Sequence, residues 1–360
     1  MRYVLLSMAV MFAGLTPAGA DPPDPWMLEL TLDGRKIEGT PLAWNTWEVH
    51  LLGRDGRIWR FPPIEAEDYH KTSDRFRSYS TSELRAMLLR ELGGDFEVTG
   101  ASHYMVAHAR GGRTQWAQRF EDLYRSFVHY FSVRGFDLQE PPCPLIGIVC
   151  RNRREFLDYR TGEGLPVGYG VVGYYSLESN RILLYDAGGG SGDASDWRRN
   201  ASTLIHEAAH QAAFNTGIHN RLTAPPLWVA EGLATMFEAP GLHNSRDFPR
   251  ESDRIHEDQL RQFGELVVGK AQSGLLAELV ASDRLFATRP PAAYATAWAL
   301  TFYLVETQRR QYADYLARTA KRPPFENCSA ADRTADFTAV FGEDWKMLEA
   351  RFFRFMEGVR

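Results

Sequence analysis

The segment HEAAH at residues 206–210 constrains this chain more than any other feature of the sequence. The residues around it, 196–216, predict one helix that ends at Gly217, a residue type that favours helix C-termini. At 3.6 residues per turn, positions i and i+4 project from one face of a helix, within about 6 Å of each other. The imidazoles of His206 and His210 can therefore hold one metal ion of tetrahedral preference.

A second predicted helix supplies a third ligand. Pro225 and Pro226 favour a helix start, and the sequence LWVAEGLA that follows places Glu231 on an otherwise apolar helix. A buried carboxylate needs a partner, which a metal ion provides. Two histidines and one glutamate, with the fourth position left to water, are typical of catalytic zinc sites. We therefore predict one zinc ion bound by His206, His210 and Glu231.

Glu207 lies one position round the helix from His206, near the predicted metal without being a ligand. A carboxylate in that place can take a proton from a water molecule that zinc activates, so we predict that Glu207 is the general base. The alternative is that His206 and His210 are structural histidines on a core helix and that the pentapeptide occurs by chance. That alternative leaves the acid of the second helix without a partner.

The first twenty residues have the pattern of a cleaved signal peptide. Arg2 gives a basic start, residues 3–15 are apolar, and the small residues 18–20 precede Asp21. The apolar run is shorter than the roughly 20 residues that a membrane-spanning helix needs. We expect a secreted or periplasmic protein whose mature form has no membrane attachment.

Charge and cysteine content exclude several other classes. Lys and Arg total 41 against 46 for Asp and Glu, so there is no electrostatic reason to expect nucleic acid or anionic membrane as a partner. The three cysteines are too few for a disulfide-rich scaffold. If the run between Cys143 and Cys150 is a strand, their sulfurs are too far apart to bond, so a disulfide would include Cys328. Three unpaired thiols are the alternative.

The order of predicted elements indicates an α+β fold. Short alternating runs from 27 to 61, broken by turn signals, predict a small β module, and a capping box at 80–83 opens a helix. A mixed sheet and then a run of helices follow. The predicted strands are 96–99, 103–109, 145–150, 167–175 and 181–185, with helices at 113–131 and 155–159 between them. The predicted segments are a signal peptide at 1–20, a β-rich module at 21–66, a linker with the capped helix at 67–94, and a catalytic domain at 95–360, with a sheet lobe at 95–190 and a zinc and helical lobe at 191–360.

HEAAH followed by WVAEGLAT resembles the gluzincin zinc metallopeptidases, and the WxxEGxA form is similar to their aminopeptidase branch. The stretch from about 97 to 355, including GYY at 173–175 and YATAWAL at 294–300, is similar to a poorly characterised group of secreted bacterial peptidase-like proteins. The resemblance implies the gluzincin fold: a mixed sheet lobe whose edge strand lies beside the zinc helix, and a helical lobe behind. It also implies His206, His210 and Glu231 as ligands and Glu207 as base. The GxMEN motif of the aminopeptidases is absent.

Three further residues are candidates for supporting roles. Hydrolysis of an amide requires a donor to the oxyanion of the tetrahedral intermediate. Tyr294, at the head of an apolar helix, is one candidate, because aminopeptidases of this group use a tyrosine in a comparable place, and His219 is a second. Each could equally be structural. Thr235 stands where thermolysin-like enzymes have an aspartate behind the metal, and it either orients a ligand or is a hydroxyl on the helix face.

The function that these features predict is a zinc metallopeptidase acting on a peptide or protein substrate. One alternative is another zinc amidohydrolase that opens amides of cell-wall peptides. The other is a zinc-stabilised binding protein without catalytic activity.

Export predicts that the mature chain begins at Asp21, because cleavage follows the small-residue segment 18–20. Amino-terminal sequencing of exported protein measures this directly. An intact Met1 on the exported protein would contradict cleavage and indicate an uncleaved anchor.

Overall fold

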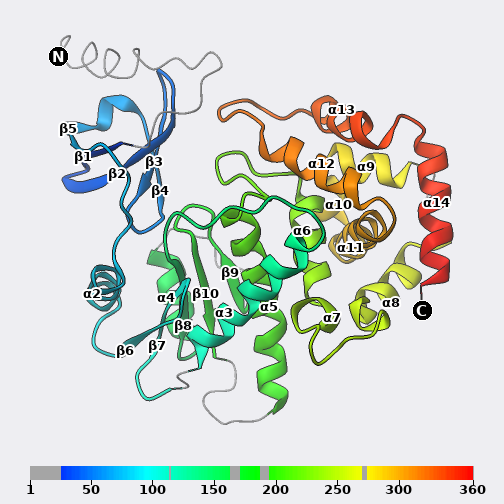
Figure 1. The fold of residues 1–360 in the computed structure, drawn as a ribbon, viewed down its shortest axis with the longest axis horizontal. Helices are drawn as coiled ribbons and strands as arrows, with labels where there is room; N and C mark the ends of the chain where they lie inside the picture. The colour runs from blue at the N-terminus through cyan, green and yellow to red at the C-terminus, as the bar shows by residue number, and fades with distance from the viewer. Residues whose placement is uncertain (1–25, 113–114, 163–170, 187–193, 270–273, 360) are drawn as a thin grey trace.

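The computed structural model describes residues 26–112, 115–162, 171–186, 194–269 and 274–359 in three parts: a β module, a sheet lobe and a helical lobe (Figure 1). This arrangement confirms the expected α+β class, with the helix of the HEAAH segment between the two lobes, as the gluzincin resemblance implies. The expected signal peptide at 1–20 and residues 167–170 of an expected strand lie outside the described residues.

The β module is a five-stranded antiparallel sheet in the order β4-β3-β2-β1-β5. Its strands are β1 (Met27–Leu32), β2 (Arg35–Trp44), β3 (Val49–Gly53), β4 (Ile58–Phe61) and β5 (Glu67–Ser73), with a short 3-10 helix, η1 (Pro63–Glu65). β5 corrects the sequence prediction, which placed these residues in a linker. This edge strand is exposed along most of its length and, within the described part of the chain, pairs only with β1, so its sequence EDYHKTS lacks the apolar alternation that predicts a strand.

The sheet lobe contains a mixed sheet in the order β6-β7-β8-β10-β9, in which β7, β8 and β10 are parallel. Alternate residues of each strand face opposite layers: Met105 packs with α2 and α4, and Tyr104 packs with α3 and α5. The elements are α2 (Thr81–Leu92), β6 (Phe96–Gly100), β7 (Tyr104–Ala109), α3 (Trp116–Ser132), β8 (Leu145–Cys150), α4 (Arg153–Gly162), β9 (Gly173–Tyr175), β10 (Arg181–Tyr185) and α5 (Ala194–Asn215). The predicted capping box opens α2 at Ser80.

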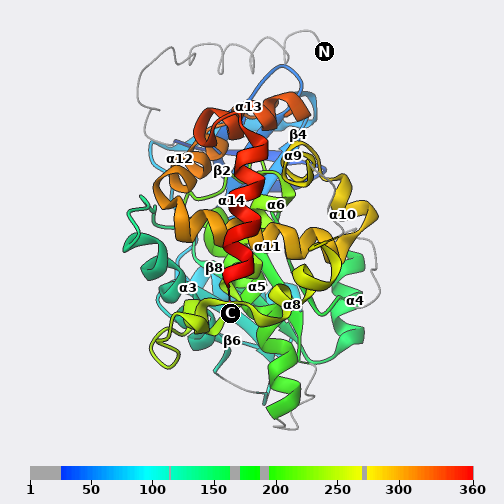
Figure 2. The same ribbon diagram turned by 90° about the vertical axis from the view of Figure 1, so that its right-hand side faces the viewer.

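The helical lobe surrounds one buried helix, α11 (Pro290–Thr307), which packs against α6, α8, α10, α12 and α14 (Figure 2). A helix that is apolar all round is expected at the centre of such a bundle. The other elements of the helical lobe are α6 (Leu227–Phe237), α7 (Pro240–His243), η2 (Ser252–Arg254), α8 (Glu257–Leu266), α9 (Leu275–Ala281), α10 (Arg284–Thr288), α12 (Arg309–Ala320), α13 (Ala330–Phe341) and α14 (Trp345–Gly358). Among the described residues, no helix is both long and apolar enough to cross a membrane.

The β module contacts the loop that joins α5 to α6. Arg221 in this loop donates from its guanidinium to the carbonyl oxygen of Gly56 at 2.9 Å and to that of Leu177 at 2.7 Å. The backbone N–H of Ile58 donates to the carbonyl of Glu178 at 2.8 Å. The module therefore holds both the turn before β10 and the connection between the two helices of the candidate site.

The three cysteines are unpaired in the structure. The sequence left open a disulfide that includes Cys328 or three unpaired thiols, and the structure has the second. Cys143 and Cys150 are buried, and burial raises the pKa of the Cys143 thiol to about 12. These side chains contribute to the packed core as small apolar groups.

Gly232, next to Glu231 on α6, allows α6 to pack closely against α11. A Cβ atom at this position would lie 2.4 Å from Thr301 Oγ1 and 2.5 Å from the carbonyl oxygen of Ala297. We predict that Gly232→Ala lowers the free energy of unfolding by about 2 kcal/mol, because overpacking forces the two helices apart. Chemical denaturation of the purified variant measures this change.

Gly264→Ala is the matched control, because Gly264 lies in helix α8 and a Cβ atom there meets nothing within 4 Å. Without a clash, the same change should raise the free energy of unfolding by about 0.5–1 kcal/mol. Equal effects at both positions would contradict the packing argument.

Candidate metal centre

Three predicted ligands converge at one point between α5 and α6. One ligand atom from each of His206, His210 and Glu231 lies within 4.8 Å of the others, and all three side chains are largely buried. The two Nε2 atoms are 3.1 Å apart. Oxygens of Glu231 lie 3.3 Å from Nε2 of His206 and 3.6 Å from Nε2 of His210. The structure thus brings together the three residues that the sequence predicted as ligands.

The three separations suit a tetrahedral zinc ion. Ligand atoms arranged tetrahedrally around zinc, at bond lengths of about 2.0–2.1 Å, are about 3.3–3.4 Å apart. Two imidazole nitrogens and a carboxylate oxygen are also the donor types that zinc prefers. The residues therefore fit zinc in both chemistry and spacing.

The fold holds α5 against the sheet through buried amides. Gln211 donates to the carbonyl oxygen of Asn180 at 2.7 Å, and the side chains of Asn180 and Asn215 exchange two hydrogen bonds of 2.7–2.8 Å. Asn180 has a positive φ of 59°, which asparagine tolerates better than most residues. Because buried polar groups require partners, this network fixes the rotation of α5 and so the direction of its histidines.

The orientation of His206 comes from Glu238, at the C-terminal end of α6. Nδ1 of His206 lies 2.9 Å from Oε1 of Glu238. A carboxylate only accepts, so Nδ1 carries the proton and Nε2 keeps its lone pair for a metal. The other oxygen of Glu238 accepts from Ser202 Oγ at 2.6 Å and lies 3.5 Å from Nε2 of His256.

The pKa values of the two carboxylates in the cluster depend on the neighbouring histidines. Burial works against a charged Glu231, but the two histidines outweigh it and hold the pKa of Glu231 well below its usual range. Burial likewise opposes ionisation of Glu238, but hydrogen bonds from His206 and His256 lower its pKa to about 2. Both carboxylates are therefore ionised at neutral pH, and Glu231 favours a cation at the point where it meets the two histidines.

Glu207 points toward the edge strand of the sheet. Its Oε2 accepts a hydrogen bond of 2.7 Å from the backbone N–H of Tyr175 in β9. One carboxylate oxygen is thus fixed by the backbone. β9 is the last strand of the sheet, so the base lies beside the sheet's edge, the arrangement that the gluzincin resemblance implies.

Tyr294 and His219 differ in their ability to donate a hydrogen bond. Tyr294, on α11, is partly exposed, and burial together with the negative charges of Glu231 and Glu207 raises its pKa, so its hydroxyl keeps its proton. His219 is buried, and its Nδ1 lies 3.1 Å from the carbonyl oxygen of Ile218, so Nδ1 carries the proton. Burial lowers the pKa of His219 to about 3, which leaves Nε2 without a proton to donate. Of the two side chains, only Tyr294 therefore keeps a hydrogen-bond donor that the backbone does not already engage.

Sequence reasoning missed the groups that support the centre. Thr235 is buried on α6, but the contact with Nδ1 of His206 comes from Glu238. Glu238 follows Glu231 by two helical turns, and this spacing was the only local signal for it. Ser202 and His256 have no motif around them, and the GYY segment at 173–175 gave no sign that the N–H of Tyr175 would contact Glu207. Packing brings all three groups in.

Comparisons with known proteins give one family model and a set of solved structures. Residues 200–326 match the model of a family described as "Protein of unknown function (DUF1570)". No curated protein sequence matches the chain. The solved structures similar to it include an M1 zinc metallopeptidase from Deinococcus radiodurans, with a TM-score of 0.42 and 14% identity over 72% of this chain and 52% of that chain. A mutant of an M1 zinc metallopeptidase from the same organism has a TM-score of 0.42 and 14% identity over 74% of this chain and 53% of the other. The chain spans about half the length of these structures.

Two variants of the centre should reduce zinc binding to different extents. We predict that Glu231→Ala abolishes stoichiometric zinc binding, because three protein ligands leave no redundancy. Glu238→Gln should keep the metal but weaken its affinity by about 10–100-fold, because a neutral amide supports the imidazole of His206 less well than a carboxylate. Elemental analysis and chelator competition measure the two effects.

Glu257→Gln, an exposed acid at the start of α8, serves as the control and should bind zinc like the wild type. Full occupancy after Glu231→Ala would show that the third ligand lies elsewhere. Unchanged affinity after Glu238→Gln would contradict its orienting role.

Proposed function

We propose that this protein is an exported zinc metallopeptidase that hydrolyses peptide bonds in a peptide or protein substrate. The observation that carries the proposal is the position of Glu207, which lies beside three converging metal ligands without being part of them. A metal site that only stabilised the fold would need no carboxylate beside it that does not bind the metal. The exported location follows from the signal-peptide pattern of the sequence.

The substrate is proposed to bind along β9. This strand is at the edge of its sheet, and an extended peptide can add to such an edge through backbone hydrogen bonds. The N–H of Tyr175 in β9 contacts Glu207, so a peptide on this edge would pass next to the base. This mode of binding recognises the backbone first and therefore suits many peptide sequences.

Each residue then has a distinct task in the reaction. Zinc, when bound by His206, His210 and Glu231, supplies the Lewis acidity that makes water nucleophilic near neutral pH. Glu207 accepts the proton of the attacking water and later delivers it to the leaving nitrogen. The hydroxyl of Tyr294 donates a hydrogen bond to the oxyanion that forms on the scissile carbonyl.

Two variants separate chemistry from metal binding. We predict that Glu207→Gln keeps fold and zinc but abolishes turnover, because an amide cannot accept the proton of the attacking water. Tyr294→Phe should also keep fold and zinc and lower turnover by about a hundredfold or more, the usual loss for one oxyanion donor. The assay is cleavage of a diverse peptide mixture followed by mass spectrometry, with and without chelator.

Wild-type activity in Glu207→Gln would overturn the proposed mechanism. Wild-type activity in Tyr294→Phe alone would show that Tyr294 is a packing residue. Cleavage of cell-wall fragments but not of peptides would favour the other class of zinc amidohydrolase, and no turnover of either substrate would favour a binding protein.

A further inference from the structure

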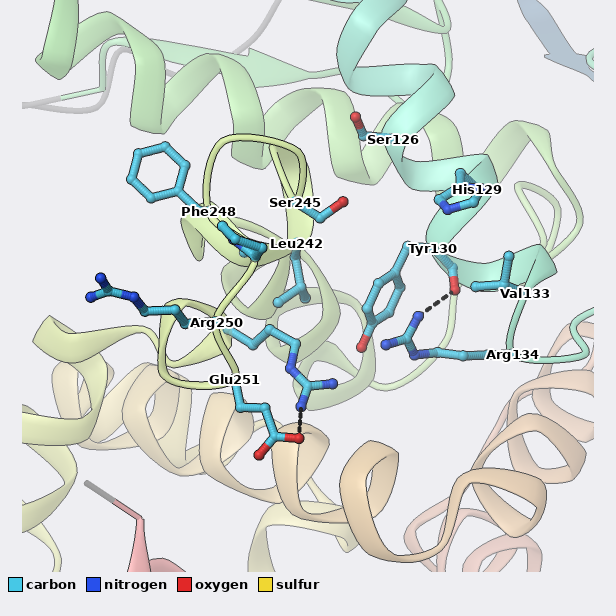
Figure 3. Close-up of a pocket in the computed structure, with 13 residues that line it drawn as sticks. Ser126, His129, Tyr130, Val133, Arg134, Leu242, Ser245, Phe248, Arg250 and Glu251 are labelled. Atoms are coloured by element: carbon cyan, nitrogen blue, oxygen red, sulfur yellow. Dashed lines mark hydrogen bonds and ion pairs between the residues drawn. The ribbon is translucent and has the colours of Figure 1, made fainter.

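A pocket separate from the candidate metal centre lies next to the segment that follows α6. It is a pocket of about 410 Å³ between the C-terminal half of α3 and the segment that contains α7 and η2 (Figure 3). This volume is in the range of small-molecule sites. Its lining includes Tyr130, Arg134, Leu242, Phe248, Arg250 and Arg254, and it contains none of the three candidate metal ligands.

The pocket carries an excess of positive charge. Arg134, Arg250 and Arg254 line it, against a single lining carboxylate, that of Glu251. Arg254 lies 3.8 Å from Glu251 and 3.5 Å from Glu306, both longer than a well-formed charged hydrogen bond. The pairing therefore neutralises the pocket only in part.

Arg134 is partly buried and has no carboxylate partner among the described residues. Its guanidinium lies over the ring of Tyr130, 3.6 Å from the ring centroid, and donates to the carbonyl oxygen of Tyr130 at 3.0 Å. Its Nε is buried and has no hydrogen-bond partner among the described residues, and no described carboxylate lies within ion-pair distance of it. Figure 3 shows the guanidinium held beside the ring of Tyr130, with Glu251 across the pocket. The stacking fixes a planar donor in place before any ligand arrives.

We propose that this pocket binds an organic anion whose carboxylate or phosphate group pairs with Arg134 and Arg254. A guanidinium presents several N–H donors in one plane, which matches both kinds of oxyanion. Leu242, Phe248 and the ring of Tyr130 provide an apolar wall for the body of the ligand. A small anion without an apolar body would leave most of the volume to water.

This site is separate from the proposed catalytic reaction. α7, which supplies Leu242, begins at Pro240 just after Glu238, so the pocket and the metal centre share one segment of chain but no side chain. Anion binding should therefore take place in zinc-free protein and in the inactive Glu207→Gln variant. Failure of the peptidase proposal would leave this one intact.

The test uses three probes of similar size on the full-length mature protein: phenylacetate, phenyl phosphate and the neutral benzyl alcohol. Isothermal titration calorimetry of Glu207→Gln should show binding of at least one of the two anions and none of the alcohol. A response to phenylacetate alone identifies a carboxylate site, and a response to phenyl phosphate alone identifies a phosphate site. Either supports the proposal, and no binding of either anion overturns it.

Variants locate the binding in the pocket. Arg134→Met should weaken the anion's affinity about tenfold or more, the usual effect of losing one hydrogen bond to a charged group. Ser245→Trp, an exposed residue of the lining, should block the space while every charge stays in place, and it covers the case in which Arg134→Met does not fold. Arg261→Met, an exposed arginine of α8 outside the pocket, is the control and should bind normally. Wild-type affinity in Ser245→Trp would overturn the proposal.

Discussion

The structure depends on one buried polar cluster, in which the carboxylate of Glu231 on α6 meets the two imidazoles of α5. A carboxylate in this environment loses most of its hydration, and only close positive or metal partners can compensate for that loss. The cluster therefore requires that two consecutive helices, α5 and α6, stay in fixed register. Much of the surrounding packing serves that requirement.

Register is fixed from both sides of the cluster. The amides of Gln211 and Asn215 hold α5 to the sheet, and the absence of a side chain at Gly232 lets α6 lie against the buried helix α11. Arg221 ties the connection between α5 and α6 to the β module. A metal site of this kind needs its ligands held to within a fraction of an ångström, and such precision comes from rigid neighbouring elements.

The candidate metal centre and the pocket next to α7 differ in the sign of the charged side chains that dominate them. Carboxylates dominate the metal centre, where Glu207, Glu231 and Glu238 gather, while arginines dominate the pocket behind α7. Ala239 is the single residue between Glu238 and α7. The first region suits a cation and the second an anion, so each pairs with a different ligand chemistry.

The sequence by itself determined the candidate metal ligands and the candidate general base, because their placement depends on local helical spacing. His206, Glu207 and His210 lie within one helical turn, and the prolines before α6 mark where the helix of Glu231 begins. The α+β class and most elements of the sheet lobe also follow from local apolar patterns. Only the tertiary structure decided that Glu238 orients His206, that Tyr175 contacts Glu207, and that β5 completes the module. These contacts join residues 32 positions or more apart, and they involve a backbone N–H and single polar side chains that leave no periodic signal in the sequence.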